Sequence, residues 1–159
     1  MNADEFTETF RQYLPKVSKH LAYRVHRNDV EDLAAEIFLI AWKKRASCPK
    51  GSELPWLYRI SGFVIANHRR KSLRNQSFQL FDTDLTVPAA EDVFLADQVL
   101  RTAWMKLEKK EQSILALAAL EDLKPAEIGV VLGLSTNAVS IKLHRARKKI
   151  EAILKELEG

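Results

Sequence analysis

The sequence has little cysteine, glycine or proline: one Cys, five Gly and five Pro in 159 residues. Cys48 has no second cysteine with which to form a disulfide or a structural zinc site, so we expect a reducing, cytoplasmic location. So few glycines and prolines exclude collagen-like and linker-like chains and disfavour a turn-rich β fold. No run of eighteen apolar residues occurs, and the acidic start MNADEFTETF is unlike a secretory signal, so we expect no membrane insertion.

Helix-forming residues and three-to-four apolar spacing dominate the rest, and they predict an all-α fold of two small helical domains joined by a flexible linker. The predicted bounds are 1–74 for the first domain, 75–96 for an acidic linker and 97–159 for the second domain. The linker contains four acidic and no basic residues, and Pro88 disfavours helix before it. Because both flanking domains are basic and the sequence pI is near 9.2, the charge pattern favours a polyanionic partner.

In the first domain, the apolar pattern predicts a helix that Pro15 kinks or separates from a second helix around 17–27. Asn28 or Asp29 is expected to cap the next helix, which begins its apolar face at Val30, and a further helix is expected from Pro55. In the second domain we expect helices over 99–107, 109–120, 125–132 and 136–157.

Residues 125–143 have helix-turn-helix spacing, with Gly133 at the turn, where a positive φ is tolerated. A helical hairpin without a DNA role is the alternative interpretation of this spacing. The second helix carries five basic residues without an acid among them: Lys142, Arg145, Arg147, Lys148 and Lys149. Such a cluster is either a solvated basic helix or a phosphate-binding surface, and the preceding helix-turn-helix favours DNA binding.

The C-terminal segment, from Glu127-Ile128-Gly129 to Leu143-His144-Arg145-Ala146-Arg147, resembles the fourth conserved region of bacterial extracytoplasmic-function (ECF) sigma factors, group IV of the sigma-70 superfamily. The first domain agrees with this resemblance. Its segments Asp29-Val30-Glu31-Asp32-Leu33 and Pro55-Trp56-Leu57-Tyr58-Arg59-Ile60 are similar to motifs of the second conserved region of these proteins. The resemblance covers nearly the whole chain and has both motif sets in family order.

The resemblance implies an alternative sigma factor that binds core RNA polymerase and directs promoter-specific transcription initiation. It implies no enzymatic activity and no cofactor, and it implies control by an anti-sigma factor. The second domain is then expected to dock in the major groove of the minus-thirty-five element through Ser135, Thr136, Asn137, Ser140, Ile141, Lys142, His144, Arg145, Arg147 and Lys148. Within this set, Arg145 is expected to contact guanine and Ile141 to pack on a thymine methyl group.

The first domain is expected to contact the minus-ten strand through Tyr58, Arg59, Phe63, Asn67, Arg70 and Arg74. Spacings of three and four place an aromatic, an amide and guanidinium groups along one helical stripe, which suits single-stranded DNA. Trp56 is interpreted as a core residue rather than a stacking platform. Arg69 and Lys71 are expected to meet phosphates, and the loop 47–53, by resemblance, to form a pocket for a flipped base.

Polymerase binding is expected on the helix that carries Asp29, Asp32, Glu36 and Phe38. The carboxylates have two other interpretations: favourable interaction with the helix dipole, and a metal site, for which a His ligand is missing. The linker carries Asp82, Asp84, Glu91 and Asp92. These acids are either solvating charge in a flexible segment or, as the resemblance implies, pass through the polymerase cleft.

The sequence departs from the family pattern in the polymerase-binding helix, in the promoter-facing helix and in the recognition helix. Ala35 replaces Gln, Ser61-Gly62-Phe63 replaces Ala-Arg-Asn, and Asn67 replaces Asp. In the recognition helix Asn137-Ala138 replaces Gly-Thr, and Ser140-Ile141 stands where Lys or Arg and Ser are common. We therefore expect an unusual promoter preference.

Two other classes of function compete with this interpretation. A stand-alone helix-turn-helix transcriptional regulator accounts for the second domain but leaves the motifs of the first domain unexplained. A protein-binding helical adaptor leaves the basic recognition helix unexplained.

Overall fold

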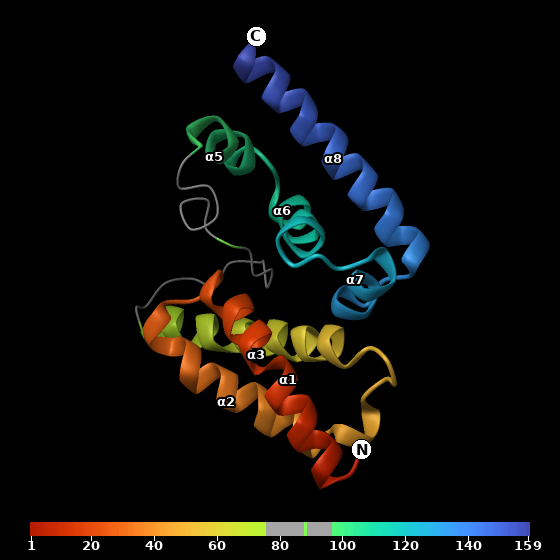
Figure 1. The fold of residues 1–159 in the computed structure, drawn as a ribbon. Helices are drawn as coiled ribbons and strands as arrows, with labels where there is room; N and C mark the ends of the chain where they lie inside the picture. Colours follow the sequence, from red (N-terminus) through yellow and green to blue (C-terminus); the bar gives the residue numbers. More distant parts are fainter. Residues whose placement is uncertain (76–87, 89–96) are drawn as a thin grey trace. The chain divides into compact units, whose positions relative to one another are not determined.

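The computed structural model describes residues 1–75, 88 and 97–159, apart from the side chains of Arg74 and Asn75. The described residues form helices and no strand, as the all-α prediction requires (Figure 1). The chain divides into two compact units, Met1–Thr86 and Val87–Gly159, called here the N-terminal and C-terminal units. The bounds of the linker stay a prediction, and its acids Asp82, Asp84, Glu91 and Asp92 lie outside the described residues.

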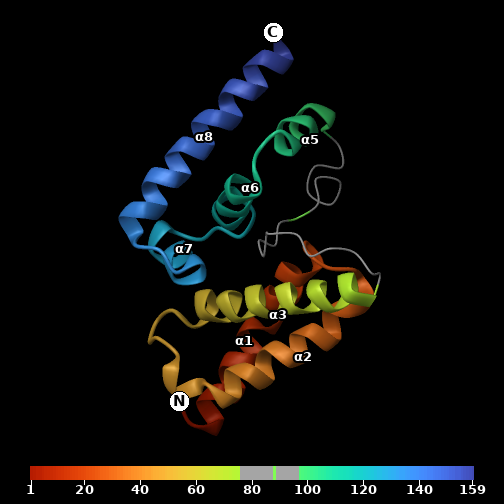
Figure 2. The ribbon, with the colours of Figure 1, turned by 180° about the vertical axis from the view of Figure 1, so that it is seen from behind.

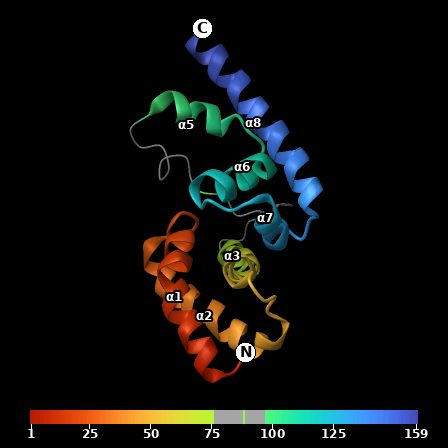
Figure 3. The same ribbon diagram turned by 45° about the vertical axis from the view of Figure 1, so that its right-hand side comes forward.

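The N-terminal unit is a bundle of three helices, α1 (Ala3–Ala22), α2 (Arg27–Lys43) and α3 (Glu53–Asn75), in which each helix packs on the other two. Figure 3 looks nearly along α3 and shows α1 and α2 beside it. Val17, Leu21, Ile37 and Ile65 have no exposed surface and form the centre of the core. Two edge-to-face aromatic pairs, Phe6 with Trp42 and Phe10 with Phe38, join α1 to α2.

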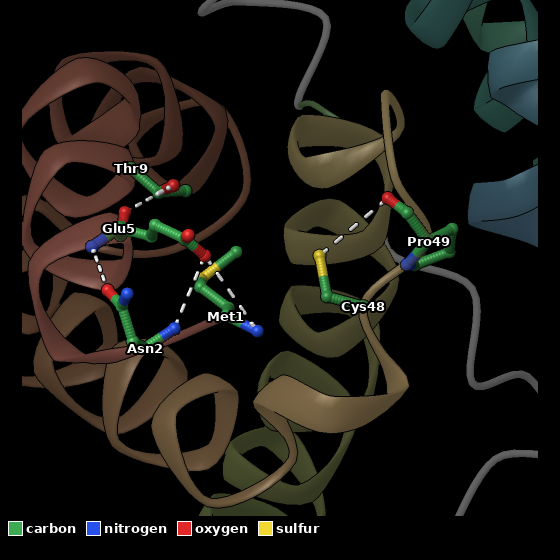
Figure 4. Close-up of polar contacts among 6 residues, drawn as sticks. All are labelled: Met1, Asn2, Glu5, Thr9, Cys48 and Pro49. Atoms are coloured by element: carbon green, nitrogen blue, oxygen red, sulfur yellow. Dashed lines mark hydrogen bonds and ion pairs between the residues drawn. The ribbon is translucent and has the colours of Figure 1, made fainter.

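Helix α1 begins with a capping box. The Asn2 side chain accepts a hydrogen bond from the Glu5 backbone N–H at 2.9 Å, and the Glu5 carboxylate accepts one from the Asn2 N–H (Figure 4). The helix then runs through Pro15 without a break, so of the two expected alternatives, a kink or a separation into two helices, the separation is wrong. Pro15 is exposed, and the burial of Val17 and Leu21 holds the helix together across the backbone hydrogen bond that proline cannot donate.

Helix α2 is capped by His26 rather than by Asn28 or Asp29, because the His26 Nδ1 accepts a hydrogen bond from the Asn28 N–H at 3.2 Å. A 3₁₀ turn, η1 (Arg45–Ser47), leads to the loop before α3. Helix α3 begins at Glu53, two residues before the expected start.

The C-terminal unit is arranged along one long helix, α8 (Thr136–Glu158). Helices α5 (Gln98–Met105), α6 (Lys109–Leu115) and α7 (Pro125–Leu132) all contact it, one after another along its length (Figures 1 and 2). A π-helical turn, η2 (Ala116–Leu120), extends α6, so the helix expected over 109–120 is formed but changes its winding. Within the described residues no single helix has the length and hydropathy to cross a membrane; α7 and α8 meet that criterion only as a pair bent by 103°.

The turn between α7 and α8 depends on two glycines. Gly133 ends α7 in the left-handed conformation, with φ 69°, as expected for the turn residue. Gly129 was not singled out by sequence, yet its backbone lies so close to the turn that an added Cβ would stand 2.6 Å from the Leu134 carbonyl oxygen. The Leu134 N–H in turn donates to the Gly129 carbonyl at 3.0 Å. These contacts fix the crossing of the two helices, which falls in the range of helix-turn-helix motifs.

We predict that Gly129→Ala lowers the free energy of unfolding of the C-terminal unit by about 1–3 kcal/mol, because backbone must move to admit the methyl group. The matched control is Gly62→Ala in α3, where an added Cβ meets nothing within 4 Å and should stabilise the helix by about 0.5–1 kcal/mol. Urea unfolding followed by far-UV circular dichroism measures both, and equal midpoints for the two variants would show that the close approach is unimportant.

Candidate nucleic-acid interface

The N-terminal end of α8 is capped and exposed. The Ser135 hydroxyl caps the helix by accepting a hydrogen bond from the Ala138 N–H at 3.1 Å. Thr136 and Asn137 are exposed, and the first turn carries no acidic side chain. The helix end therefore presents small polar groups and partial positive charge, the arrangement that binds phosphate or base edges.

One side of α8 is buried and the other is exposed. Val139, Leu143 and Ala146 are at most 4% exposed and pack against α5, α6 and α7. The structure brings all the predicted minus-thirty-five residues to the exposed remainder of the helix and its cap: Ser135, Thr136, Asn137, Ser140, Ile141, Lys142, His144, Arg145, Arg147 and Lys148. Their contact with DNA stays a prediction.

Lys149 differs from the other basic residues of this cluster. Its ammonium donates a hydrogen bond to the Glu111 carboxylate of α6 at 2.8 Å. Partial burial acts to raise the pKa of Glu111, but hydrogen bonds from Lys149 and from the Glu108 backbone outweigh it and leave that pKa below its ordinary value. The same hydrogen bond raises the pKa of Lys149. Lys149 therefore ties α8 to α6 and does not belong to the phosphate-binding surface.

Helix α3 presents a second stripe. Phe63 is 65% exposed, and the Arg59 guanidinium lies 5.5 Å from its ring centroid, in cation–π range. Asn67 and Arg70 follow on the same side of the helix and are partly buried. Trp56, interpreted from sequence as a core residue, is only partly buried and falls on this stripe two turns before Phe63. The side chain of Arg74, also expected here, lies outside the described part of the chain.

Tyr58 does not belong to this stripe, and its prediction as a minus-ten contact is wrong for this conformation. Its side chain is 4% exposed and stacks on the buried His20 ring of α1, with the centroids 4.3 Å apart and the planes at 10°. The ring faces the bundle because Tyr58 lies next to Leu57 on the buried side of α3. It has no face available to a base.

Arg69 also has a structural role. Its guanidinium donates to the Arg24 carbonyl oxygen at 3.1 Å, which joins the end of α3 to the turn after α1. Burial, together with repulsion from the Arg24 guanidinium, lowers the pKa of Arg69 from its ordinary value. The expected phosphate contact of Arg69 is therefore replaced by a tie within the bundle, whereas Lys71 is exposed.

The outer side of α2 carries the predicted polymerase-binding carboxylates. Asp32 and Glu36 are exposed, and Asp29 lies 3.4 Å from His68 of α3. Phe38 is 4% exposed and packs edge-to-face on Phe10 at 4.4 Å, so its assignment to a binding surface is wrong. Leu39, which the sequence reading missed, is 54% exposed beside the acidic residues. The sequence signal is the run of four apolar residues at 37–40, because a helix cannot bury four consecutive side chains on one side.

The loop before α3 contains the lone cysteine. The Cys48 thiol lies 3.8 Å from the Pro49 carbonyl oxygen (Figure 4). Burial, and then the nearby Glu53 carboxylate, raise the pKa of this thiol. Among the residues that the structure describes, no three His, Cys, Asp or Glu side chains lie close enough together to hold a metal ion. The carboxylates of Asp32 and Glu36 form an exposed acidic surface on α2.

The fold and these surfaces define a two-unit, all-helical DNA-binding protein with a helix-turn-helix in its C-terminal unit. The family model for sigma-70 region 2 matches residues 9–75, and the model for sigma-70 region 4 matches residues 97–150. The chain belongs to the sigma-70 family, in the ECF class. Its members are transcription-initiation factors and not enzymes, which confirms the sequence-based assignment.

Full-length relatives agree with this assignment. The RNA polymerase sigma factor YlaC of Bacillus subtilis is 29% identical over 157 residues, with 93% of this chain and 91% of that protein covered. The sigma factor CarQ of Myxococcus xanthus is 29% identical over 164 residues, with 98% and 92% covered.

Solved structures agree in fold. The Bartonella quintana sigma factor RpoE, solved in complex with the anti-sigma factor NepR, superposes with a TM-score of 0.65 at 20% identity, and covers 96% of this chain and 98% of that one. CnrH, solved with the cytosolic domain of CnrY, gives a TM-score of 0.63 at 20% identity, over 98% and 90% of the chains.

We predict that the pair between Glu111 and Lys149 makes the C-terminal unit sensitive to acid. Because the pKa of Glu111 is lowered by folding, its contribution to stability is present above the unfolded value of about 4.3 and is lost as pH falls through the folded value. Glu111→Gln keeps the oxygen that caps α6 but removes the charge. Urea midpoints measured from neutral to acid pH should therefore fall less for Glu111→Gln than for the wild type.

The matched control is Glu156→Gln, which changes an exposed carboxylate near the end of α8. It should keep the acid sensitivity of the wild type. Identical pH profiles for Glu111→Gln and the wild type would mean that the pair contributes nothing.

Proposed function

We propose that this chain is an ECF-type alternative sigma factor that binds core RNA polymerase and directs promoter-specific initiation in the cytoplasm. The observation that carries the proposal is that one chain has two different exposed surfaces whose side chains suit DNA. The recognition helix α8 suits duplex DNA, whereas the aromatic and basic stripe of α3 suits an unpaired strand. A protein that helps to open a promoter needs both.

In this mechanism the C-terminal unit docks α8 in the major groove of the minus-thirty-five element. Phosphate contacts from Lys142, Arg147 and Lys148 set the register, and the outer face of the first turns reads base edges. The Ser135 cap and the two turn glycines hold α8 at its angle to α7, so the reading face needs no rearrangement.

The N-terminal unit takes the minus-ten strand along α3. Phe63 offers an exposed ring on which a base can stack, and Arg59 beside it adds positive charge for the backbone. Asn67 and Arg70 extend this stripe toward the end of the helix. Where the family pattern has Asn at the position of Phe63, a ring replaces an amide, so stacking replaces hydrogen bonding there.

Polymerase binding is assigned to the outer side of α2, where Asp32 and Glu36 surround the exposed Leu39. An apolar side chain with a charged rim is a common composition for a protein-binding surface. Control by an anti-sigma factor is part of the proposal, supported by the fold shared with RpoE and CnrH, whose structures contain NepR and CnrY.

The competing class is a stand-alone helix-turn-helix regulator. Such a regulator would also bind duplex DNA through α8, but it would leave the exposed Phe63 and the acidic side of α2 without a function. Run-off transcription with purified core RNA polymerase on a pool of genomic promoter fragments separates the two. Start sites that depend on the protein would support the sigma factor, whereas salt-sensitive duplex binding without transcripts or core binding would support the regulator.

We predict that Arg145→Ala weakens use of the upstream element while polymerase binding is retained. Arg145 is exposed on the outer side of α8, and loss of a bidentate guanine contact removes about 1–3 kcal/mol of discrimination. The matched control is Lys155→Ala, which removes an exposed positive charge from the last turns of the same helix. Transcription from promoters with and without an intact upstream element measures the effect, and equal activity from both would contradict the role.

We predict that Asp32→Ala weakens binding to core polymerase by about five- to thirtyfold, a loss of about 1–2 kcal/mol, without changing duplex contacts. Glu31→Ala is the control, because Glu31 is also an exposed carboxylate of α2 but points to a different side of the helix. Fluorescence titration of labelled protein with core polymerase measures both. An unchanged affinity for Asp32→Ala would remove this surface from the interface.

A further inference from the structure

The last turns of α3 depend on polar contacts more than on the apolar core. Val64, Ile65 and Ala66 are at most 7% exposed, but among the side chains that the structure describes in α3 none after Ala66 is buried. A helix end without apolar burial frays unless directional contacts order it. The position of this segment is therefore set largely by its hydrogen bonds and ion pairs.

Two consecutive residues make such contacts, in two directions. The Nε2 atom of His68 lies 3.4 Å from a carboxylate oxygen of Asp29, in the first turn of α2. The Arg69 guanidinium donates a hydrogen bond at 3.1 Å to the Arg24 carbonyl oxygen, in the turn after α1. Figures 1 and 2 both show this end of α3 beside the turn that joins α1 to α2. The segment is thus attached to both other helices of the bundle.

The acceptor of the Arg69 hydrogen bond is itself well ordered. Arg24 is 7% exposed, and its guanidinium donates to the His20 carbonyl oxygen at 3.1 Å. The backbone N–H groups of Arg24 and Val25 donate to the Leu21 carbonyl oxygen at 2.8 and 2.9 Å. Burial of Arg69 and repulsion from the Arg24 guanidinium both disfavour its charge and lower its pKa. The hydrogen bond therefore joins α3 to a rigid part of the bundle, at an electrostatic cost.

The two contacts fix the rotation of α3 about its own axis. Successive residues of a helix are about 100° apart, so residues 67–70 point in four directions around one turn. With His68 and Arg69 directed at the bundle, Asn67 and Arg70 fall on the other side, about 60° apart. They lie in line with Phe63, one and two turns earlier. This is the stripe to which the proposed function assigns the minus-ten strand.

We propose that His68 and Arg69 are positioning residues, which hold the last turns of α3 so that Asn67 and Arg70 face the unpaired strand. This inference rests on the proposed binding of that strand by α3. The two positioning residues act in the free protein and touch no nucleotide. Because they keep the end of α3 in its binding conformation, they reduce the ordering that binding requires.

Salt dependence distinguishes a positioning cation from a cation that contacts phosphate. The probe is a single-stranded oligonucleotide with the minus-ten segment of a promoter that the holoenzyme uses, and its affinity for holoenzyme is measured over a range of salt concentrations. Arg69→Leu should weaken binding by about five- to tenfold, because a smaller fraction of the protein has α3 ordered. The logarithmic salt slope should stay that of the wild type, because every cation that meets the strand is still present.

The matched control is Lys71→Leu, which removes an exposed cation two residues further along α3. It should reduce the slope by about 0.7, the value for one phosphate contact on a single strand. Arg69→Lys keeps a donor for the Arg24 carbonyl oxygen and should recover most of the lost affinity. Hydrogen exchange of the backbone amides after residue 66 should be faster in Arg69→Leu and unchanged in Lys71→Leu.

His68→Leu is an independent test of the same proposal. It removes the pair with Asp29 and should speed hydrogen exchange over the same turns. Its loss of affinity should be smaller than that of Arg69→Leu, because the two side chains of the pair are 36% and 41% exposed. This variant also decides the question if Arg69→Leu proves too unstable to fold.

Three results would overturn the proposal: unchanged affinity of Arg69→Leu, a salt slope reduced as in Lys71→Leu, or unchanged hydrogen exchange at the end of α3. Each is measured on a holoenzyme that binds the oligonucleotide, so each leaves the sigma-factor function intact. A wild-type holoenzyme that transcribes but does not bind the oligonucleotide would overturn the role of α3 and this inference together. Failure of the proposed function itself is recognised separately, as absence of protein-dependent transcripts from any promoter fragment.

Discussion

The C-terminal unit depends on one amphipathic helix, because α5, α6 and α7 all pack against the same side of α8. Burial of Val139, Leu143 and Ala146 fixes the rotation of α8 about its own axis. Once that rotation is set, every other residue of the helix has a determined direction. The residues that pack in the core therefore also determine which residues of α8 are exposed, and a change on the buried side would turn the exposed side as well.

Helix α3 of the N-terminal unit likewise has one side that packs in the core and one side that is exposed. Tyr58 faces inward and stacks on His20, while Phe63 faces outward with Arg59 beside it. Two aromatic residues five positions apart thus have opposite roles. The inward ring packs within the three-helix bundle, and the outward ring with Arg59 forms an exposed stripe on it.

Most of the fold could be predicted from sequence, because apolar periodicity and turn residues are local signals. The helices of the C-terminal unit and the role of Gly133 followed from such signals. The errors have a common physical cause. Tyr58 and Phe38 each lie in a helix with apolar residues on more than one side, and only the packing against α1 decides which ring is buried.

The hydrogen-bond partners of two basic residues also could not be predicted from local sequence patterns. Lys149 binds Glu111, 38 positions away, and Arg69 binds the Arg24 carbonyl, 45 positions away. In the sequence both residues belong to basic runs, and nothing there shows that their side chains are already bonded within the fold. The close approach of Gly129 to Leu134 is hidden for the same reason, because it arises from the fold of the turn.

The engagement of Lys149 has a consequence for how the protein responds to ionic strength. DNA affinity falls with salt in proportion to the number of phosphates that a protein neutralises, with a logarithmic slope of about −0.9 per phosphate. In the proposed complex with DNA, Lys149 is engaged by Glu111, so the salt dependence is expected to be less steep than the run of cations implies. In that complex, a larger share of the affinity is then expected from contacts to base edges, which distinguish one promoter from another.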